Sequence, residues 1–133
     1  MELIREINNN IKINDPGLVY KNYLKEFKNE DKEFFIVIGL DSENKAMYRE
    51  VVSIGGLNSS IVEPRGVFKK AIMMSCNSLI LAHNHPSGSL TPSTEDINIT
   101  EKLKQGGVIL GIKILDHLIF NYNGYKSVIK EVE

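Results

Sequence analysis

The sequence contains one cysteine among its 133 residues, which excludes an internal disulfide. It lacks an apolar run of the ~18 residues that a membrane-spanning helix requires, and its first residues, MELIREINNN, do not have the profile of a signal peptide. It also lacks a dominant charge, because 16 Lys and Arg residues stand beside 17 Asp and Glu residues, for a net charge of −1. These absences predict a cytoplasmic location and no membrane partner. They also lower the expectation of nucleic-acid binding, which would need a local basic patch in a chain of this charge.

The composition is typical of a single globular domain. Hydrophobic residues make up 42% of the chain and charged residues 25%. A chain of this length can bury one core, and no repeat or low-complexity linker divides it, so we expect one domain over residues 1–133. Cys76 lies in an apolar stretch of helical pattern and is interpreted as a small core residue.

The first thirty residues predict two short strands and a helix. LIREI and IKI are strand-like and lie on either side of an Asn8-Asn9-Asn10 turn. Asp15-Pro16 is typical of a helix N-cap followed by proline at the first helical position. Apolar residues at helical spacing then predict an amphipathic helix over 16–29; they are Val19, Tyr20, Tyr23, Leu24 and Phe27.

Strand and helix patterns alternate through the rest of the chain. A helix is expected to begin at Pro64, and a second is expected to begin at Ser93 and to stop at Gly106-Gly107. The inner stripe of the first of these helices is predicted to be Val67, Phe68, Ala71, Ile72 and Met74 or Ser75. Strands are predicted over 34–40 and 46–56, which form a hairpin around a turn at 41–44, and over 78–83, 108–120 and 126–129. The order predicts an α/β sandwich with a mixed sheet and about three helices.

The stretch LAHNHPSGSLTPSTED, residues 81–96, holds the strongest candidate for a functional site. Side chains two apart on a strand point to the same face, about 6.6–6.8 Å apart at their Cα atoms. His83 and His85 can therefore lean toward one point at the strand end, and neutral imidazole is a good zinc ligand. The loop PSGSLTP turns the chain back, so Asp96 in the first turn of the next helix adds a carboxylate. Three protein ligands with a fourth position left for water are typical of catalytic zinc.

A structural explanation fits the same residues. Ser93 through Asp96 also fit an ordinary helix start, with Ser93 as N-cap and acidic side chains near the positive helix end. Two histidines one residue apart at a strand end do not establish a metal site by themselves. The two interpretations are compatible, since a capping serine can face a site.

The spacing His-x-His, seven residues, Ser, two residues, Asp resembles the JAMM (MPN+) signature of zinc metalloproteases and isopeptidases. The surrounding motifs HNHPSG, TPSTED, LDHLIF and GGLNSSIVEPRGVFKKAI resemble those of the RadC-like branch of that superfamily. The resemblance extends from about Asp15 to Ser127. The resemblance implies a JAB/MPN-like, cytidine-deaminase-like fold in three layers, with a mixed sheet and about three helices. It also implies one Zn²⁺ per chain held by His83, His85 and Asp96.

The resemblance further implies the catalytic roles. Its general base, a glutamate entering an early strand, matches Glu33, directly before FFIVIGL; Glu63 is the reserve candidate and Glu50 a weaker one. Ser93 would donate a hydrogen bond to the oxyanion. The implied activity is zinc-dependent hydrolysis of a peptide or isopeptide bond in a protein or peptide substrate. Asp116 and His117 are interpreted as partners that support the ligands or the fold.

The sequence departs from the RadC pattern at three places. The helix-hairpin-helix DNA-binding region that usually precedes the domain in RadC proteins is not expected in so short a chain. Gly66 stands where a glutamate is usual, and Ser89-Leu90 where an acidic residue is common. Two other functions therefore stay open, a non-catalytic interaction module and an accessory factor in DNA repair or processing. The sequence does not define the oligomeric state.

Overall fold

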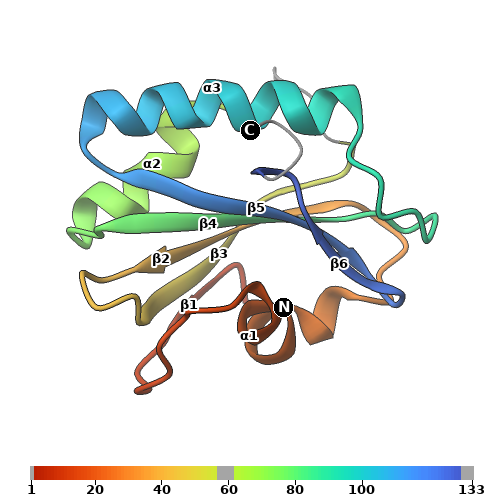
Figure 1. Cartoon of the computed structure of the whole chain (residues 1–133), viewed down its shortest axis with the longest axis horizontal. Helices are drawn as coiled ribbons and strands as arrows, with labels where there is room; N and C mark the ends of the chain where they lie inside the picture. The colour runs from red at the N-terminus through yellow and green to blue at the C-terminus, as the bar shows by residue number, and fades with distance from the viewer. Residues whose placement is uncertain (1, 57–61, 130–133) are drawn as a thin grey trace.

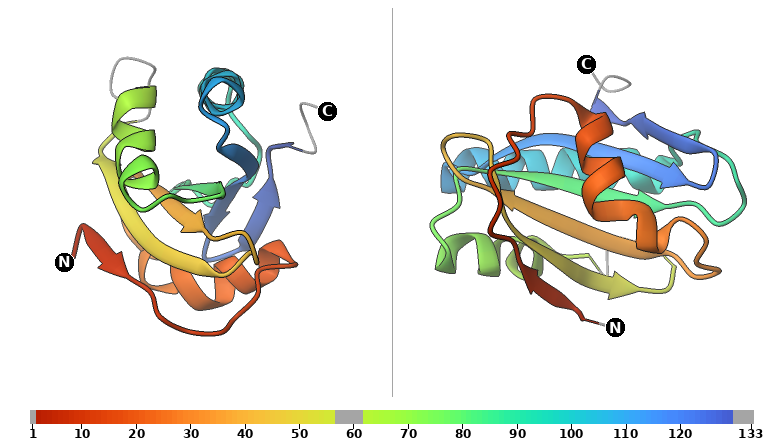
Figure 2. Two further views of the ribbon diagram at one scale, coloured as in Figure 1. Left: turned by 90° about the vertical axis from the view of Figure 1, so that its left-hand side faces the viewer. Right: turned by 90° about the horizontal axis from the view of Figure 1, so that it is seen from below.

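The computed structural model describes residues 2–56 and 62–129, and these segments form three layers (Figure 1). A sheet of six strands in the described segments lies in the middle, with α2 and α3 on one face and α1 on the other (Figure 2). The α/β architecture with a mixed sheet is thus as predicted. The elements are β1 (Ile4–Glu6), α1 (Pro16–Val19), β2 (Phe34–Leu40), β3 (Ala46–Ile54), α2 (Pro64–Met73), β4 (Ser78–Asn84), α3 (Thr94–Leu110), β5 (Lys113–Asn121) and β6 (Gly124–Ser127).

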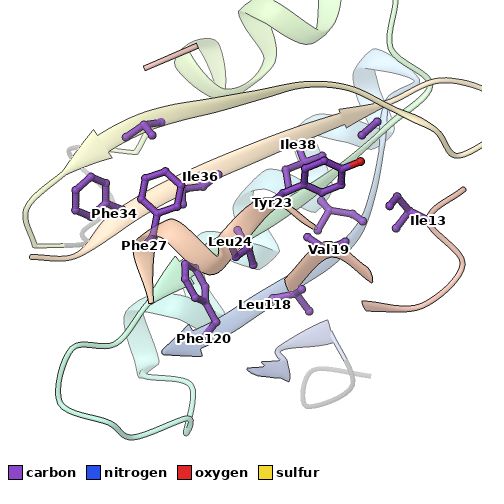
Figure 3. Packing of buried hydrophobic residues seen from close by; sticks show 14 of the residues in the cluster. Ile13, Val19, Tyr23, Leu24, Phe27, Phe34, Ile36, Ile38, Leu118 and Phe120 are labelled. Atoms are coloured by element: carbon purple, nitrogen blue, oxygen red, sulfur yellow. The ribbon is translucent and has the colours of Figure 1, made fainter. Parts of the chain in front are cut away.

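The order of the strands explains why β2 and β4 are apolar throughout. The order is β1-β3-β2-β4-β5-β6, in which β4 and β5 run parallel and the other neighbours run antiparallel. The two central strands β2 and β4 are covered by helices on both faces, and all their residues are buried. One apolar cluster packs between the sheet and the first helical segment (Figure 3). A second cluster packs between the sheet and α2 with α3.

The first helical segment is less regular than the predicted helix over 16–29. Asp15 caps it as expected, since its side chain accepts a hydrogen bond from the Gly17 amide at 2.9 Å. After α1, however, the chain widens into a π-helical turn (η1, Tyr20–Leu24) and then tightens into a 3-10 turn (η2, Lys25–Phe27). These turns still bury Tyr23, Leu24 and Phe27 as the spacing predicted. Of the two predicted N-terminal strands, LIREI contains β1, while IKI makes only a single bridge between Lys12 and Lys45.

The prediction that α3 stops at Gly106-Gly107 is wrong. The helix continues to Leu110 and ends at Gly111, whose φ of 72° lies in the left-handed region that favours glycine. The two earlier glycines are packing positions instead. A Cβ at Gly107 would lie 2.3 Å from the backbone oxygen of Ile112, and one at Gly106 would lie 3.2 Å from the Phe68 ring. Residues 108–110, predicted as part of a strand, are therefore helical.

Two predictions about α2 are corrected in detail. Ile72 does not belong to its inner stripe, because this side chain is 55% exposed, whereas Val67, Phe68 and Ala71 are buried. Cys76 is a buried core residue as expected, but it lies in the turn after α2 and not in the helix. Within residues 2–56 and 62–129, the helices are all too short or too polar to cross a bilayer.

Candidate metal and catalytic site

The site begins where β4 ends. His83 is buried near the end of this strand, and the imidazole of His85 lies next to it, with ring centroids 5.0 Å apart at 84°. His85 lies beyond the antiparallel pairing with β2, and its amide donates to the carbonyl of Phe120 on β5 at 2.9 Å. The two histidines therefore face one region at the carboxyl end of β4, as the strand spacing predicted.

The start of α3 brings a carboxylate to this region. The loop after β4 turns back at the right of Figure 1 and leads into α3, which Ser93 caps. Ser93 and Asp96 form a reciprocal capping box: the Asp96 amide donates to Ser93 Oγ at 3.1 Å, and the Ser93 amide donates to Asp96 Oδ2 at 2.7 Å. The capping interpretation is thus correct, and it places the Asp96 carboxylate, which is 0% exposed, against the histidines.

Asp96 contacts both imidazoles. Its Oδ1 lies 2.9 Å from Nδ1 of His83, and its Oδ2 lies 3.0 Å from Nε2 of His85. Burial alone would raise the pKa of Asp96, but hydrogen bonds from both histidines and from the Ser93 amide outweigh it and hold the pKa far below its usual value. The hydrogen bond to Asp96 in turn raises the pKa of His85. A buried anion is therefore fixed between two nitrogen donors.

Glu33 lies on the other edge of the His83 ring. Its Oε1 is 3.5 Å from Nε2 of His83, and its side chain is 35% exposed. The Glu33 carbonyl accepts from the Gly55 amide at 2.8 Å, which ties the start of β2 to the end of β3. The atoms with which Glu33, His83 and His85 could ligate a metal ion all lie within 4.8 Å of one another. His83 therefore stands between two carboxylates, Asp96 at Nδ1 and Glu33 at Nε2.

The donor set fits a transition metal of the zinc type. Nitrogen and carboxylate oxygen are ligands that zinc accepts. Nε2 of His83 is buried and has no hydrogen-bond partner among the described residues. This nitrogen lies on the Glu33 side of the ring, and a buried nitrogen without a hydrogen-bond partner is costly unless something binds it. The fit rests on this nitrogen and on the convergence of the ligand atoms of Glu33, His83 and His85.

The two reserve glutamates lie elsewhere. Glu50 lines a pocket with Lys69 and Lys70 below α2, and its burial raises the pKa of its carboxyl group. Glu63 precedes α2 and forms a surface ion pair with Arg65, whose side chain is 89% exposed. Arg65 thus belongs to the helix start, and the structure brings Glu33 rather than Glu50 or Glu63 to the histidines.

His117 is linked to the start of α3 through Thr100, while Asp116 hydrogen-bonds within β5 and to β6. The Thr100 hydroxyl donates to the carbonyl of Asp96 at 2.7 Å, so it accepts from Nδ1 of His117 at 2.6 Å. Burial lowers the pKa of His117 to about 3, so the ring is neutral. Asp116 accepts from the His117 amide and from the Ser127 hydroxyl, and thereby ties β5 to β6.

Sequence reasoning missed three residues around the site. Thr100 links His117 to the first turn of α3 through its hydroxyl. Asn121 donates from Nδ2 to the carbonyls of His85 and Ser89, both at 3.0 Å, and so fastens the loop that follows β4. Asn84, between the two histidines, is 1% exposed and bonds to the chain around Glu33. The signal available in the sequence was the amide of Asn84 at the end of an apolar strand, because an amide that becomes buried there needs partners.

The chain is similar to known proteins over most of its length. The family model described as "RadC-like JAB domain" matches residues 13–132. A UPF0758 protein of Methanosarcina mazei is 51% identical over 117 residues, which cover 88% of this chain and 51% of the relative. UPF0758 protein SH1266 of Staphylococcus haemolyticus is 44% identical over 127 residues, covering 96% of this chain and 56% of the relative. The chain thus spans about half the length of the curated relatives it matches.

Proposed function

This chain belongs to the RadC-like JAB domain family, and on that premise we propose that it is a zinc-dependent metallohydrolase that cleaves peptide or isopeptide bonds. The observation that carries the proposal is the position of His83 between the carboxylates of Asp96 and Glu33, beside His85. Two imidazoles with two carboxylates in distinct surroundings are what metal-assisted hydrolysis uses.

We assign one Zn²⁺ to His83, His85 and Asp96. The third ligand, Asp96, follows from the family spacing. In the structure its oxygens hydrogen-bond directly to both imidazoles, so an ion bound by all three residues would replace these two hydrogen bonds, while the capping box would still hold the carboxylate. Glu33 is partly exposed, and its ligand atom lies within 4.8 Å of those of both histidines, so it is the carboxylate that the Asp96 assignment must be tested against. When bound, zinc would polarise the scissile carbonyl group and make water nucleophilic near neutral pH.

Glu33 is assigned as the general base. Its carboxylate lies at the rim of the site, where solvent and substrate can reach it, and it would take a proton from the attacking water and return it to the leaving amine. Ser93 is assigned to hydrogen-bond the developing oxyanion. Its hydroxyl donates to Asp96 Oδ2 at 2.8 Å in the structure, so this role requires the hydroxyl proton to turn away from Asp96.

A protein or peptide is the proposed substrate, and the cytoplasm is the proposed location. The activity, substrates and partners of the longer relatives are part of the same proposal, since the chain spans about half of their length. A non-catalytic interaction module and a DNA-processing factor are the alternatives. A module would not need Glu33, and a DNA-processing factor would bind DNA with an affinity that falls as salt rises.

Zinc content and peptide cleavage test the proposal together. We expect close to one zinc per chain after purification with added zinc, and cleavage of a mixture of quenched fluorescent peptides, or of a peptide with an isopeptide-linked lysine. Glu33→Gln should slow cleavage by ~10²–10⁴-fold. Asp31→Asn, which removes an exposed carboxylate two residues away, should leave the rate unchanged. Less than a tenth of an equivalent of metal, or equal rates for Glu33→Gln and wild type, would overturn the proposal.

A further inference from the structure

Asn84 makes two hydrogen bonds that bracket Glu33. Its Oδ1 accepts from the amide of Phe34 at 2.5 Å, and its Nδ2 donates to the carbonyl of Lys32 at 2.8 Å. These backbone groups belong to the residues immediately before and after Glu33. Asn84 is itself 1% exposed, so both bonds are shielded from water.

The side-chain amide of Asn84 continues the hydrogen bonding between β2 and β4 where the backbone pairing of these strands ends. The pairing of β2 with β4 stops at Phe35 and His83, and beyond it the His85 amide turns to β5. The Asn84 side chain therefore supplies the link to β4 for the end of β2 that carries Glu33. On the opposite side, the Gly55 amide holds the Glu33 carbonyl at 2.8 Å. The backbone around Glu33 is thus held from both neighbouring strands.

We propose that Asn84 is a positioning residue that holds Glu33 against the histidine pair. This inference rests on the proposed function. A single side chain must donate to Lys32 and accept from Phe34, and a primary amide does both, whereas a carboxylate offers acceptors alone. Since Asn84 lies between His83 and His85 in the chain, it also couples the position of the base to the strand that carries the two ligands.

Asn121 provides a matched comparison. It is likewise a fully buried amide at this end of the sheet, and it bonds to the carbonyls of His85 and Ser89 instead of to the chain around Glu33. Removing either amide leaves backbone groups unpaired, so both substitutions cost stability. A role through Glu33 is specific to Asn84.

A double-mutant cycle in Co²⁺ affinity tests the proposal without a substrate. The dissociation constant of Co²⁺ is measured for the full chain by competition with a chromophoric chelator, with circular dichroism confirming that each variant is folded. Asn84→Ala and Glu33→Gln should each weaken binding about 10-fold, in the range found for side chains that support metal ligands. In the Glu33→Gln background, Asn84→Ala should cause no further loss. Asn121→Ala should weaken binding by the same factor in both backgrounds.

Two contrary results are distinguishable, and a second variant covers failure of the first to fold. If the wild type fails to bind Co²⁺, the proposed function fails and the positioning role fails with it. If the wild type binds Co²⁺ but Asn84→Ala costs the same factor with and without Glu33, Asn84 is a structural residue and the inference is overturned. If Asn84→Ala does not fold, Asn84→Leu replaces it, because it keeps nearly the size of the side chain, loses both hydrogen bonds and adds no charge beside the histidines. It should then show the same dependence on Glu33.

Discussion

Oδ1 of Asp96 lies 2.9 Å from Nδ1 of His83, although 13 positions separate the two residues in the chain. The contact joins the first turn of α3 to the last residues of β4. The first turn of α3 is therefore part of the site, and the same contact helps to hold α3 against the sheet. Both ends of this contact are buried, so it is little screened by salt.

Replacement of Asp96 by asparagine should reduce zinc affinity more than replacement of Glu33 by glutamine. The asparagine side chain would keep the shape of the aspartate but would lose the charge that a cation needs. We expect a loss of about 100-fold for Asp96→Asn, against about 10-fold for Glu33→Gln, both measured by isothermal titration calorimetry. The reverse order would identify Glu33 as the third ligand, on the Nε2 side of His83.

Thr100→Val should destabilise the protein by about 1–3 kcal/mol, because it leaves the Nδ1–H of buried His117 and the Asp96 carbonyl without the hydroxyl between them. Valine has nearly the shape of threonine, so the change in packing is small. Urea unfolding followed by circular dichroism measures the loss. Thr100→Ser retains the hydroxyl and should retain more of the stability; a larger loss for serine than for valine would contradict this role of the hydroxyl.

The adjacent glycines of α3 should differ in their response to alanine. At Gly107 the added Cβ would meet the backbone oxygen of Ile112 at 2.3 Å, which cannot move aside without shifting β5. We expect Gly107→Ala to destabilise by about 1–3 kcal/mol. At Gly106 the neighbour is the Phe68 ring, at 3.2 Å, and the gain in helix propensity of about 1 kcal/mol offsets the crowding. Thermal unfolding of the two variants side by side would refute this if Gly106→Ala proved the more damaging.

Glu26→Gln should reduce stability at neutral pH and should matter little in acid. Buried Arg49 hydrogen-bonds to Glu26 and lowers its pKa from the ordinary 4.5. The folded-state pKa is thus below the unfolded value, so the contribution is complete above pH 4.5 and is lost as pH falls through the folded-state pKa. We expect a difference of about 1 kcal/mol at neutral pH, since Glu26 is half exposed.

The measurement is urea unfolding of wild type and Glu26→Gln over a range of pH. The two curves of unfolding free energy against pH should converge below pH 4.5. A constant difference down to the acid limit would mean that the charge of Glu26 does not contribute, and that the variant acts through packing.

Much of the fold could be predicted because local patterns and tertiary packing agree in the central strands. The runs over 34–40 and 78–83 are buried on both faces, which is what an apolar run without alternation indicates. The predictions failed where packing overrides a local preference. Gly106-Gly107 signals a helix end in sequence, but here the missing side chains let α3 approach α2 and the start of β5. Ile72 fits the helical spacing and yet is 55% exposed, because the buried side of α2 is confined to Val67, Phe68 and Ala71.

The site could be predicted in part from sequence. The residues His83, His85, Ser93 and Asp96 carry a recognisable spacing, and the structure brings them together with Glu33. The spacing cannot predict which nitrogen of an imidazole contacts which carboxylate, because this depends on the rotation of the ring. It also does not contain the partners of a buried amide, which is why Asn84 and Asn121 were not foreseen.

The capping box has a consequence for how this sequence responds to mutation. Ser93 and Asp96 start α3 whether or not a metal binds, so a library of random variants selected only for folded protein would already retain both. Glu33 caps no helix in the described part of the chain, and its side chain is partly exposed. The same selection would therefore accept other residues at position 33. Among folded variants, retention of glutamate at position 33 would therefore indicate selection for activity, because selection for folding alone does not require it.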